Sequence, residues 1–90
     1  MMYPYMTFED GTEVVHSQLI QDGETEKVLV HFERPTDQGF DSARCELPSY
    51  VWTNWEGEFS ADDKASFEVF LRNNAHLIYR YAAEGGLKVA

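Results

Sequence analysis

Apolar residues follow two different spacings in this chain, and the change falls near Ser60. Before Ser60 they mostly alternate with polar residues in short runs separated by turn residues, which is typical of strands. After it they recur three and four positions apart, which is the spacing of an amphipathic helix. The helical stripe consists of Phe67, Phe70, Leu71, Asn74, Leu77, Ile78 and Tyr81. The pattern therefore predicts an α+β domain, with an antiparallel β-meander first and one long C-terminal helix packed on one sheet face.

Turn residues divide residues 1–48 into about four predicted strands. Asp10-Gly11 and Asp22-Gly23 are typical of β-hairpin turns, and Pro48 ends the last strand. Pro4 predicts an edge position for the first strand, because proline cannot donate a hydrogen bond to a neighbouring strand. The strands are expected at residues 3–8, 12–21, 27–34 and 40–47.

The second part is predicted to be an aromatic-rich connection over 49–59, a helix over 60–84 and a tail over 85–90. Ser60 and Asp63 have the spacing of a capping box. Gly85 suits the left-handed residue that commonly ends a helix, and the tail has room for a short terminal strand over 87–90. A chain of 90 residues with this organisation is expected to form a single domain.

Alternation along the strands, with a two-residue turn at Asp10-Gly11, assigns the apolar residues to two faces. The face expected to carry the helix holds Met6, Phe8, Val15, Leu19, Val28, Val30 and Phe32. The other face holds Tyr3, Tyr5, Thr7, Val14, His16, Ile20, Leu29 and His31. Because this second face is also partly apolar, we expect it to lie either under the aromatic connection or against a partner.

Tryptophan is enriched at the energetic centres of protein interfaces, so Trp52 and Trp55 are the strongest candidates for binding. The alternative is that both rings cover the core. The candidate interaction surface consists of Tyr3, Tyr5, His16, Leu29, His31, Trp52 and Trp55.

Two further side chains could serve either structure or chemistry. Asn74 lies within the apolar stripe of the helix, so its buried amide needs partners, either loop backbone or a ligand in a pocket. Cys45 alternates with Ala43 and Leu47, which favours a buried structural thiol over a nucleophile.

His16 and His31 are predicted to lie opposite or diagonal to one another on the second face, where a metal could bind. Zinc usually needs three or four ligands, and no spacing enforces a third here. The alternative is that His16 stacks on Tyr5 across the strands. The sequence assigns no catalytic residue, no metal ligand and no cofactor, and it favours a non-enzymatic protein.

The formal net charge is −9, and residues 1–63 carry 14 Asp and Glu against three basic residues. So acidic a surface opposes direct binding to nucleic acid, but suits a basic partner or imitation of nucleic acid. No apolar run approaches the roughly 20 residues that span a bilayer. With one cysteine and no secretion signal, we expect a cytoplasmic protein without a membrane partner.

A resemblance to a group of known proteins extends over most of the chain. It is carried by three segments, YPYMTFEDGTEVVHS, GFDSARCELPSY and NNAHLIYRYAAEGG. The chain resembles small proteins of unassigned activity from gut Firmicutes, some of them on mobile elements. The resemblance implies a bacterial cytoplasmic setting and an accessory or interaction role, and it carries no catalytic residue over.

The expected function is a protein–protein interaction module that binds another protein or itself as a homodimer. One alternative is an acidic inhibitor that imitates nucleic acid and blocks a basic protein. The other is a small-molecule or metal-binding protein that uses His16 and His31.

Overall fold

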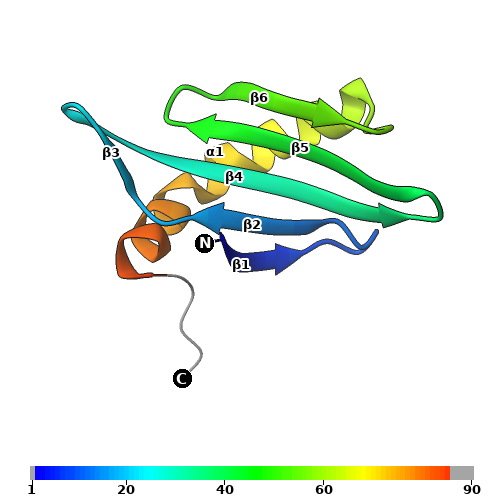
Figure 1. The fold of residues 1–90 in the computed structure, drawn as a ribbon, viewed down its shortest axis with the longest axis horizontal. Helices are drawn as coiled ribbons and strands as arrows, with labels where there is room; N and C mark the ends of the chain where they lie inside the picture. Colours follow the sequence, from blue (N-terminus) through cyan, green and yellow to red (C-terminus); the bar gives the residue numbers. More distant parts are fainter. Residues whose placement is uncertain (1, 86–90) are drawn as a thin grey trace.

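The computed structural model describes residues 2–85 and has the α+β architecture that the change of spacing predicted. One antiparallel sheet has the strand order β1-β2-β4-β5-β6, and the short β3 pairs with one end of β4 (Figure 1). The elements are β1 (Met2–Thr7), β2 (Glu13–Ser17), β3 (Ile20–Asp22), β4 (Thr25–Thr36), β5 (Gly39–Leu47), β6 (Val51–Glu56) and α1 (Ala61–Glu84). The terminal strand expected over 87–90 lies outside the described residues.

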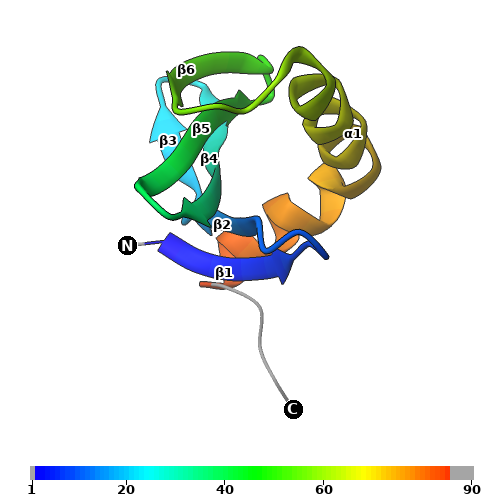
Figure 2. The same cartoon turned by 90° about the vertical axis from the view of Figure 1, so that its right-hand side faces the viewer.

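The connection expected over 49–59 is largely a strand, because β6 pairs along β5. β1 is an edge strand, as Pro4 predicted, and β6 forms the opposite edge of the sheet. The sheet curves strongly, and α1 closes its open side (Figure 2). We call the sheet face toward α1 the covered face and the opposite one the outer face.

The core lies between the covered face and α1. At its centre the rings of Phe32 and Phe67 stack with centroids 4.2 Å apart. Leu71 and Ile78 on α1 are fully buried, as the helical spacing predicted. The buried apolar side chains are Val14, Val28, Val30, Phe32, Ala43, Cys45, Leu47, Phe59, Phe67, Leu71, Ile78 and Ala82.

Both ends of α1 are where the sequence placed them. The Ser60 side chain accepts from the Asp63 amide at 3.1 Å, and the Asp63 carboxylate accepts from the Ser60 amide at 2.8 Å. This is the predicted capping box, and it satisfies two amides that the first helical turn leaves free. Gly85 ends the helix with φ 82°, in the left-handed region that glycine adopts without strain.

The first hairpin does not have the predicted two-residue turn. The amide of Phe8 donates to the carbonyl of Thr12 at 2.8 Å, so residues 9–11 form a three-residue loop. Gly11 provides the positive φ, 89°, that such a loop requires at its last position. The extra residue shifts β1 by one position along β2, so that Met6 lies opposite Val14 instead of Val15, and Met6 remains 46% exposed at the edge of the sheet.

The register of β2 also differs from the predicted one. A break at residues 18–19 separates β2 from β3, and the register against β4 changes by one residue across that break. Ile20 lies opposite Lys27, whereas Val14 lies opposite Phe32. A shift of one residue moves every side chain of a strand to the other face. Val14 and His16 therefore lie on the covered face, where the sequence analysis had placed Val15.

Candidate functional site

The predicted interaction surface is divided between the two faces of the sheet. Tyr3 pairs with His16 in the β1–β2 register, and His16 is fully buried on the covered face. Tyr5 also lies on this side, where its ring contacts those of His16 and Phe70. These residues do not form the open surface that the sequence analysis predicted.

The remaining members of that predicted surface lie apart from one another. Leu29 and His31 are partly exposed on the outer face, since they alternate with the buried Val28, Val30 and Phe32 of β4. Trp52 and Trp55 lie on the covered side at the edge formed by β6. There Trp52 contacts the rings of Phe32 and Phe67, so it covers the core, while Trp55 remains 37% exposed.

A hollow of about 340 Å³ opens between the edge of β6 and the first turn of α1. It is lined by Trp52, Trp55, Phe59, Ala61 and Lys64, and we call it the aromatic hollow. The rings of Trp52 and Trp55 meet at 87° with centroids 5.3 Å apart, and those of Trp55 and Phe59 meet at 59°. The three rings are therefore steeply inclined to one another and do not form a flat stack.

A β-bulge at Thr53 brings the two tryptophans to the same side of β6. Arg44 of β5 lies opposite Asn54, and Cys45 lies opposite Trp52, so Thr53 is an extra residue in β6. In a regular strand, residues three apart point to opposite faces. The bulge inserts one position, and Trp55 consequently points to the same side as Trp52.

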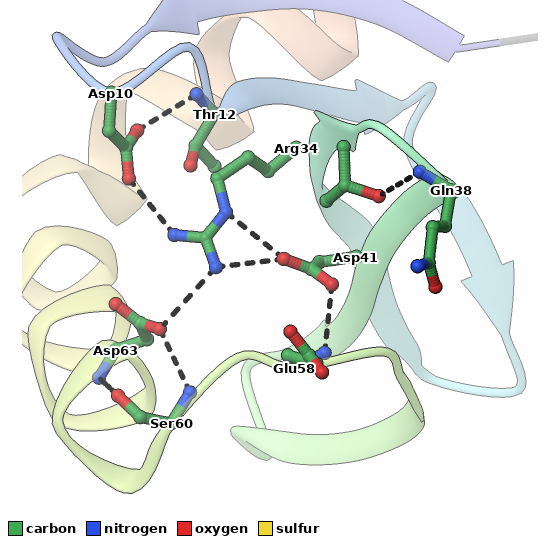
Figure 3. Close-up of polar contacts among 9 residues, drawn as sticks. Asp10, Thr12, Arg34, Gln38, Asp41, Glu58, Ser60 and Asp63 are labelled. Carbon is green, nitrogen blue, oxygen red and sulfur yellow. Dashed lines mark hydrogen bonds and ion pairs between the residues drawn. The ribbon is translucent and has the colours of Figure 1, made fainter.

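The wall of the aromatic hollow is held by a polar cluster around Arg34 of β4 (Figure 3). The Arg34 guanidinium donates to the Asp41 carboxylate at 2.8 and 3.1 Å, and it lies 4.7 Å from the centroid of the Phe59 ring. The second oxygen of Asp41 accepts from the Glu58 amide at 2.8 Å. Arg34 also lies 4.0 Å from the Asp63 carboxylate at the start of α1. The cluster thus fixes the segment between β6 and α1.

Gly57 is where the segment between β6 and α1 comes close to the backbone of β5. Its φ is 90°, and a Cβ built there would lie 2.8 Å from the Cα of Asp41. The backbone of residue 57 can pass β5 at this distance only without a side chain. The Arg34 cluster and Gly57 together fix the approach of the connection to β5.

Two carboxylates of the cluster, those of Asp10 and Asp41, have a lowered pKa. The hydrogen bond from the Glu58 amide, and then Arg34, hold the pKa of Asp41 below its usual value. For Asp10 the hydrogen bonds from Thr12 lower the pKa most, with a smaller contribution from Arg34. Both carboxylates accept hydrogen bonds from backbone amides and from Arg34, so they act as structural anchors.

Asn74 has a structural partner that the sequence did not indicate. Its Oδ1 accepts from the Tyr5 hydroxyl at 2.8 Å, and its Nδ2 donates to the Phe70 carbonyl at 2.9 Å. Burial, and secondarily Tyr81, raises the pKa of Tyr5, which keeps this phenol protonated as a donor. The pair joins β1 to the middle of α1.

We expect Asn74→Ala to lower the free energy of unfolding by about 1–2 kcal/mol, because it leaves the Tyr5 hydroxyl without its acceptor. Urea denaturation measures the change. Asn73→Ala is the matched control on the exposed side of the same helix, with an expected effect within about 0.5 kcal/mol. Equal effects of the two substitutions would show that the bond to Tyr5 does not stabilise the fold.

The two histidines do not form the predicted pair. His16 lies on the covered face, where its Nδ1 is 2.7 Å from the carbonyl of Ser17 and Tyr3 and Tyr5 pack on its ring. His31 lies on the outer face beside Arg44, and burial, then Arg44, lowers its pKa. The placement of both histidines on one face was wrong, because of the register change in β2. Within residues 2–85 no three His, Cys, Asp or Glu side chains are arranged to hold a metal ion.

Cys45 is fully buried in the core, as its alternation with Ala43 and Leu47 predicted. Burial, and then Glu68 and Glu46, raises the pKa of its thiol to about 12. Because the thiolate is the nucleophile, the thiol is inert at neutral pH.

At pH 8 we expect Ellman's reagent to label Cys45 at least a hundredfold more slowly in the native protein than in urea. The raised native pKa leaves on the order of one thiol in 10⁴ ionised at pH 8, and the native rate should rise with pH up to the alkaline limit of folding. Equal labelling rates in buffer and in urea would contradict the buried placement.

The comparisons with protein-family models, curated proteins and solved structures find no match to this chain. Among residues 2–85 no helix is both long and apolar enough to cross a membrane. A function must therefore be inferred from the residues and their geometry.

The sequence named Trp52 and Trp55 as binding candidates, which stays a prediction, and it gave no indication of the other residues that line the hollow. Phe59 and Ala61 come close to the tryptophans only because the connection after β6 folds back. Arg34 and Asp41 carried a weak signal, since they flank the predicted loop 35–39 with opposite charges. No sequence pattern indicated the bulge.

Proposed function

We propose that this chain is a non-enzymatic protein-binding module of the bacterial cytoplasm whose contact site is the aromatic hollow. The observation that carries the proposal is the position of Trp55. Trp55 is 37% exposed at the edge of the sheet, and its ring lies against those of Trp52 and Phe59, beside Lys64. Tryptophan in a preformed hollow is typical of the anchor points of protein interfaces.

Rigidity of the site supports the same function. The Arg34 cluster holds the wall that carries Phe59 through hydrogen bonds from two strands and the start of α1. A preformed surface binds more tightly than one that must be ordered during binding, because less conformational entropy is lost. A cluster that braces this wall is consistent with a contact site.

The test is a tagged pull-down from nuclease-treated lysate of the source cell, followed by reconstitution with the purified partner. Trp55→Ser is expected to lose the partner while its circular dichroism spectrum stays unchanged. Phe40→Ser is the matched control, because Phe40 is a 64% exposed aromatic at the β4–β5 hairpin. A partner that Trp55→Ser retains, or that Phe40→Ser also loses, overturns the assignment of the hollow.

Self-association is the second form of the same proposal. Sedimentation of the purified protein gives the oligomeric state. A dimer that Trp55→Ser dissociates would identify a second copy as the occupant of the hollow. A monomer that retains no protein from the lysate overturns the binding function.

A row of carboxylates on the outer face supports a second candidate function, the acidic inhibitor of a basic protein. Glu13 lies opposite Glu33, and the row continues through Ser42 to Glu56. Like charges directly opposite one another destabilise a sheet, so such a pair is unusual. Binding through this row should weaken steeply with salt and with Glu13→Gln/Glu33→Gln. Binding that is insensitive to both would exclude this candidate.

A further inference from the structure

We propose that the occupant of the aromatic hollow is an extended, basic peptide segment of another protein. One apolar side chain of the segment fills the hollow, and its backbone pairs with the outer edge of β6. This inference rests on the proposed binding function and specifies its partner.

The outer edge of β6 is the second basis of the inference. β6 is the last strand of the sheet, and in the part of the chain that the structure describes no strand pairs with its outer side. An unpaired edge presents alternate amide and carbonyl groups, to which an extended peptide can add as a further strand. The edge residues next to the hollow are Asn54, Trp55 and Glu56, so backbone and side-chain contacts would meet at one place.

The bulge at Thr53 disfavours a second copy of the chain as the occupant. It interrupts the straight edge of β6, and interrupted edges are poor templates for long strand-to-strand pairing. Pairing is then confined to the short stretch 54–56, where a flexible peptide can adapt. The formal charge of −9 also makes two copies repel one another.

The lining of the hollow suits an apolar side chain. Three aromatic rings and the Ala61 methyl line the approximately 340 Å³ of this open depression, and Lys64 adds the aliphatic part of its side chain. The indole N–H of Trp52 already donates to Glu68 at 3.3 Å. The N–H of Trp52 is thus bonded to α1, and the apolar part of its ring is the part that a ligand can contact.

The charged residues beside the hollow indicate which residues of the peptide should flank its apolar side chain. Glu58 precedes Phe59 and Asp62 follows Ala61, so both are chain neighbours of residues that line the hollow, and both are exposed. Lys64 is the one cation among the residues that line the hollow. Because carboxylates outnumber cations here, we expect the peptide to carry lysine or arginine on either side of the apolar residue that enters the hollow.

The experiment probes an array of random eight-residue synthetic peptides with fluorescently labelled protein. Peptides that bind the wild type are expected to combine one large apolar residue with at least two Lys or Arg, and Trp55→Ser is expected to lose them. Glu58→Gln/Asp62→Asn should weaken binding by about three- to tenfold. Glu24→Gln/Glu26→Gln, in exposed positions at the β3–β4 hairpin, is the matched charge control and should change affinity less than twofold.

Backbone pairing is tested with N-methylated versions of the best peptide. Methyl groups on one set of alternate amides should weaken binding at least tenfold, and those on the other set should have little effect, since only alternate amides face β6. Bound peptides without basic residues, equal tolerance of both methylated sets, or no bound peptide overturn the inference. A partner captured from lysate, lost in Trp55→Ser and not displaced by any array peptide would leave the proposed function standing and refute only the peptide mode.

Discussion

Phe67→Ala is expected to lower the free energy of unfolding by about 3–5 kcal/mol, the range for removing a buried aromatic side chain. Phe67 is 4% exposed and stacks on Phe32 with the planes only 9° apart. Its ring also lies against those of Phe8, Trp52 and Phe59. The truncation would therefore leave a cavity at the point where sheet, helix and aromatic hollow meet.

Such a loss is large for this protein, because domains of this size are typically stable by about 5–15 kcal/mol in total. Urea denaturation followed by tryptophan fluorescence measures the change. Val69→Ala is the matched control on the same helix, where Val69 is 55% exposed, and its effect should stay within about 0.5 kcal/mol. A cost below about 1 kcal/mol for Phe67→Ala would contradict the packing of α1 on the covered face.

Gly57→Ala is expected to cost about 3 kcal/mol, although it adds only one methyl group. The φ of 90° is strained for any residue with a side chain, at about 1 kcal/mol or more. The new Cβ would also press on the backbone of Asp41, which cannot move without disturbing the Arg34 cluster. Overpacking of this kind adds about 1–3 kcal/mol.

Gly11→Ala separates the two contributions. Gly11 has nearly the same φ, 89°, but no atom lies within 4 Å of a Cβ built there. Its substitution should cost only the backbone term, about 1 kcal/mol. Equal melting temperatures of the two variants would show that the approach of Gly57 to Asp41 is not a constraint. Because the same segment carries Phe59, Gly57→Ala should also weaken binding at the hollow, whereas Gly11→Ala should not.

The sequence by itself determined the class of the fold and its local features. The change of apolar spacing, the capping box at Ser60 and Gly85 gave the helix and both of its ends. Pro4 indicated an edge strand, and the alternation around Cys45 correctly placed this thiol in the core. Each of these features depends on residues within a few positions of one another, and such local preferences can be read without the rest of the chain.

Only the tertiary structure decided which residues share a face. One extra residue in the loop 9–11, the break at 18–19 and the bulge at Thr53 each shift a strand register by one position. Because side chains alternate along a strand, each shift moves a whole set of residues to the other face. This is why His16 is buried away from His31, and why Trp52 and Trp55 share one hollow.

The hydrogen-bond and ion-pair partners of the polar residues could not be predicted from the sequence either. Arg34 meets Asp10, Asp41 and Asp63 across separations of 24, 7 and 29 positions in the chain. Tyr5 and Asn74 are 69 positions apart. No local pattern specifies such pairs, since they form only once the sheet curves around α1. The class of the fold thus follows from local spacing, whereas the candidate site follows from register and long-range contact.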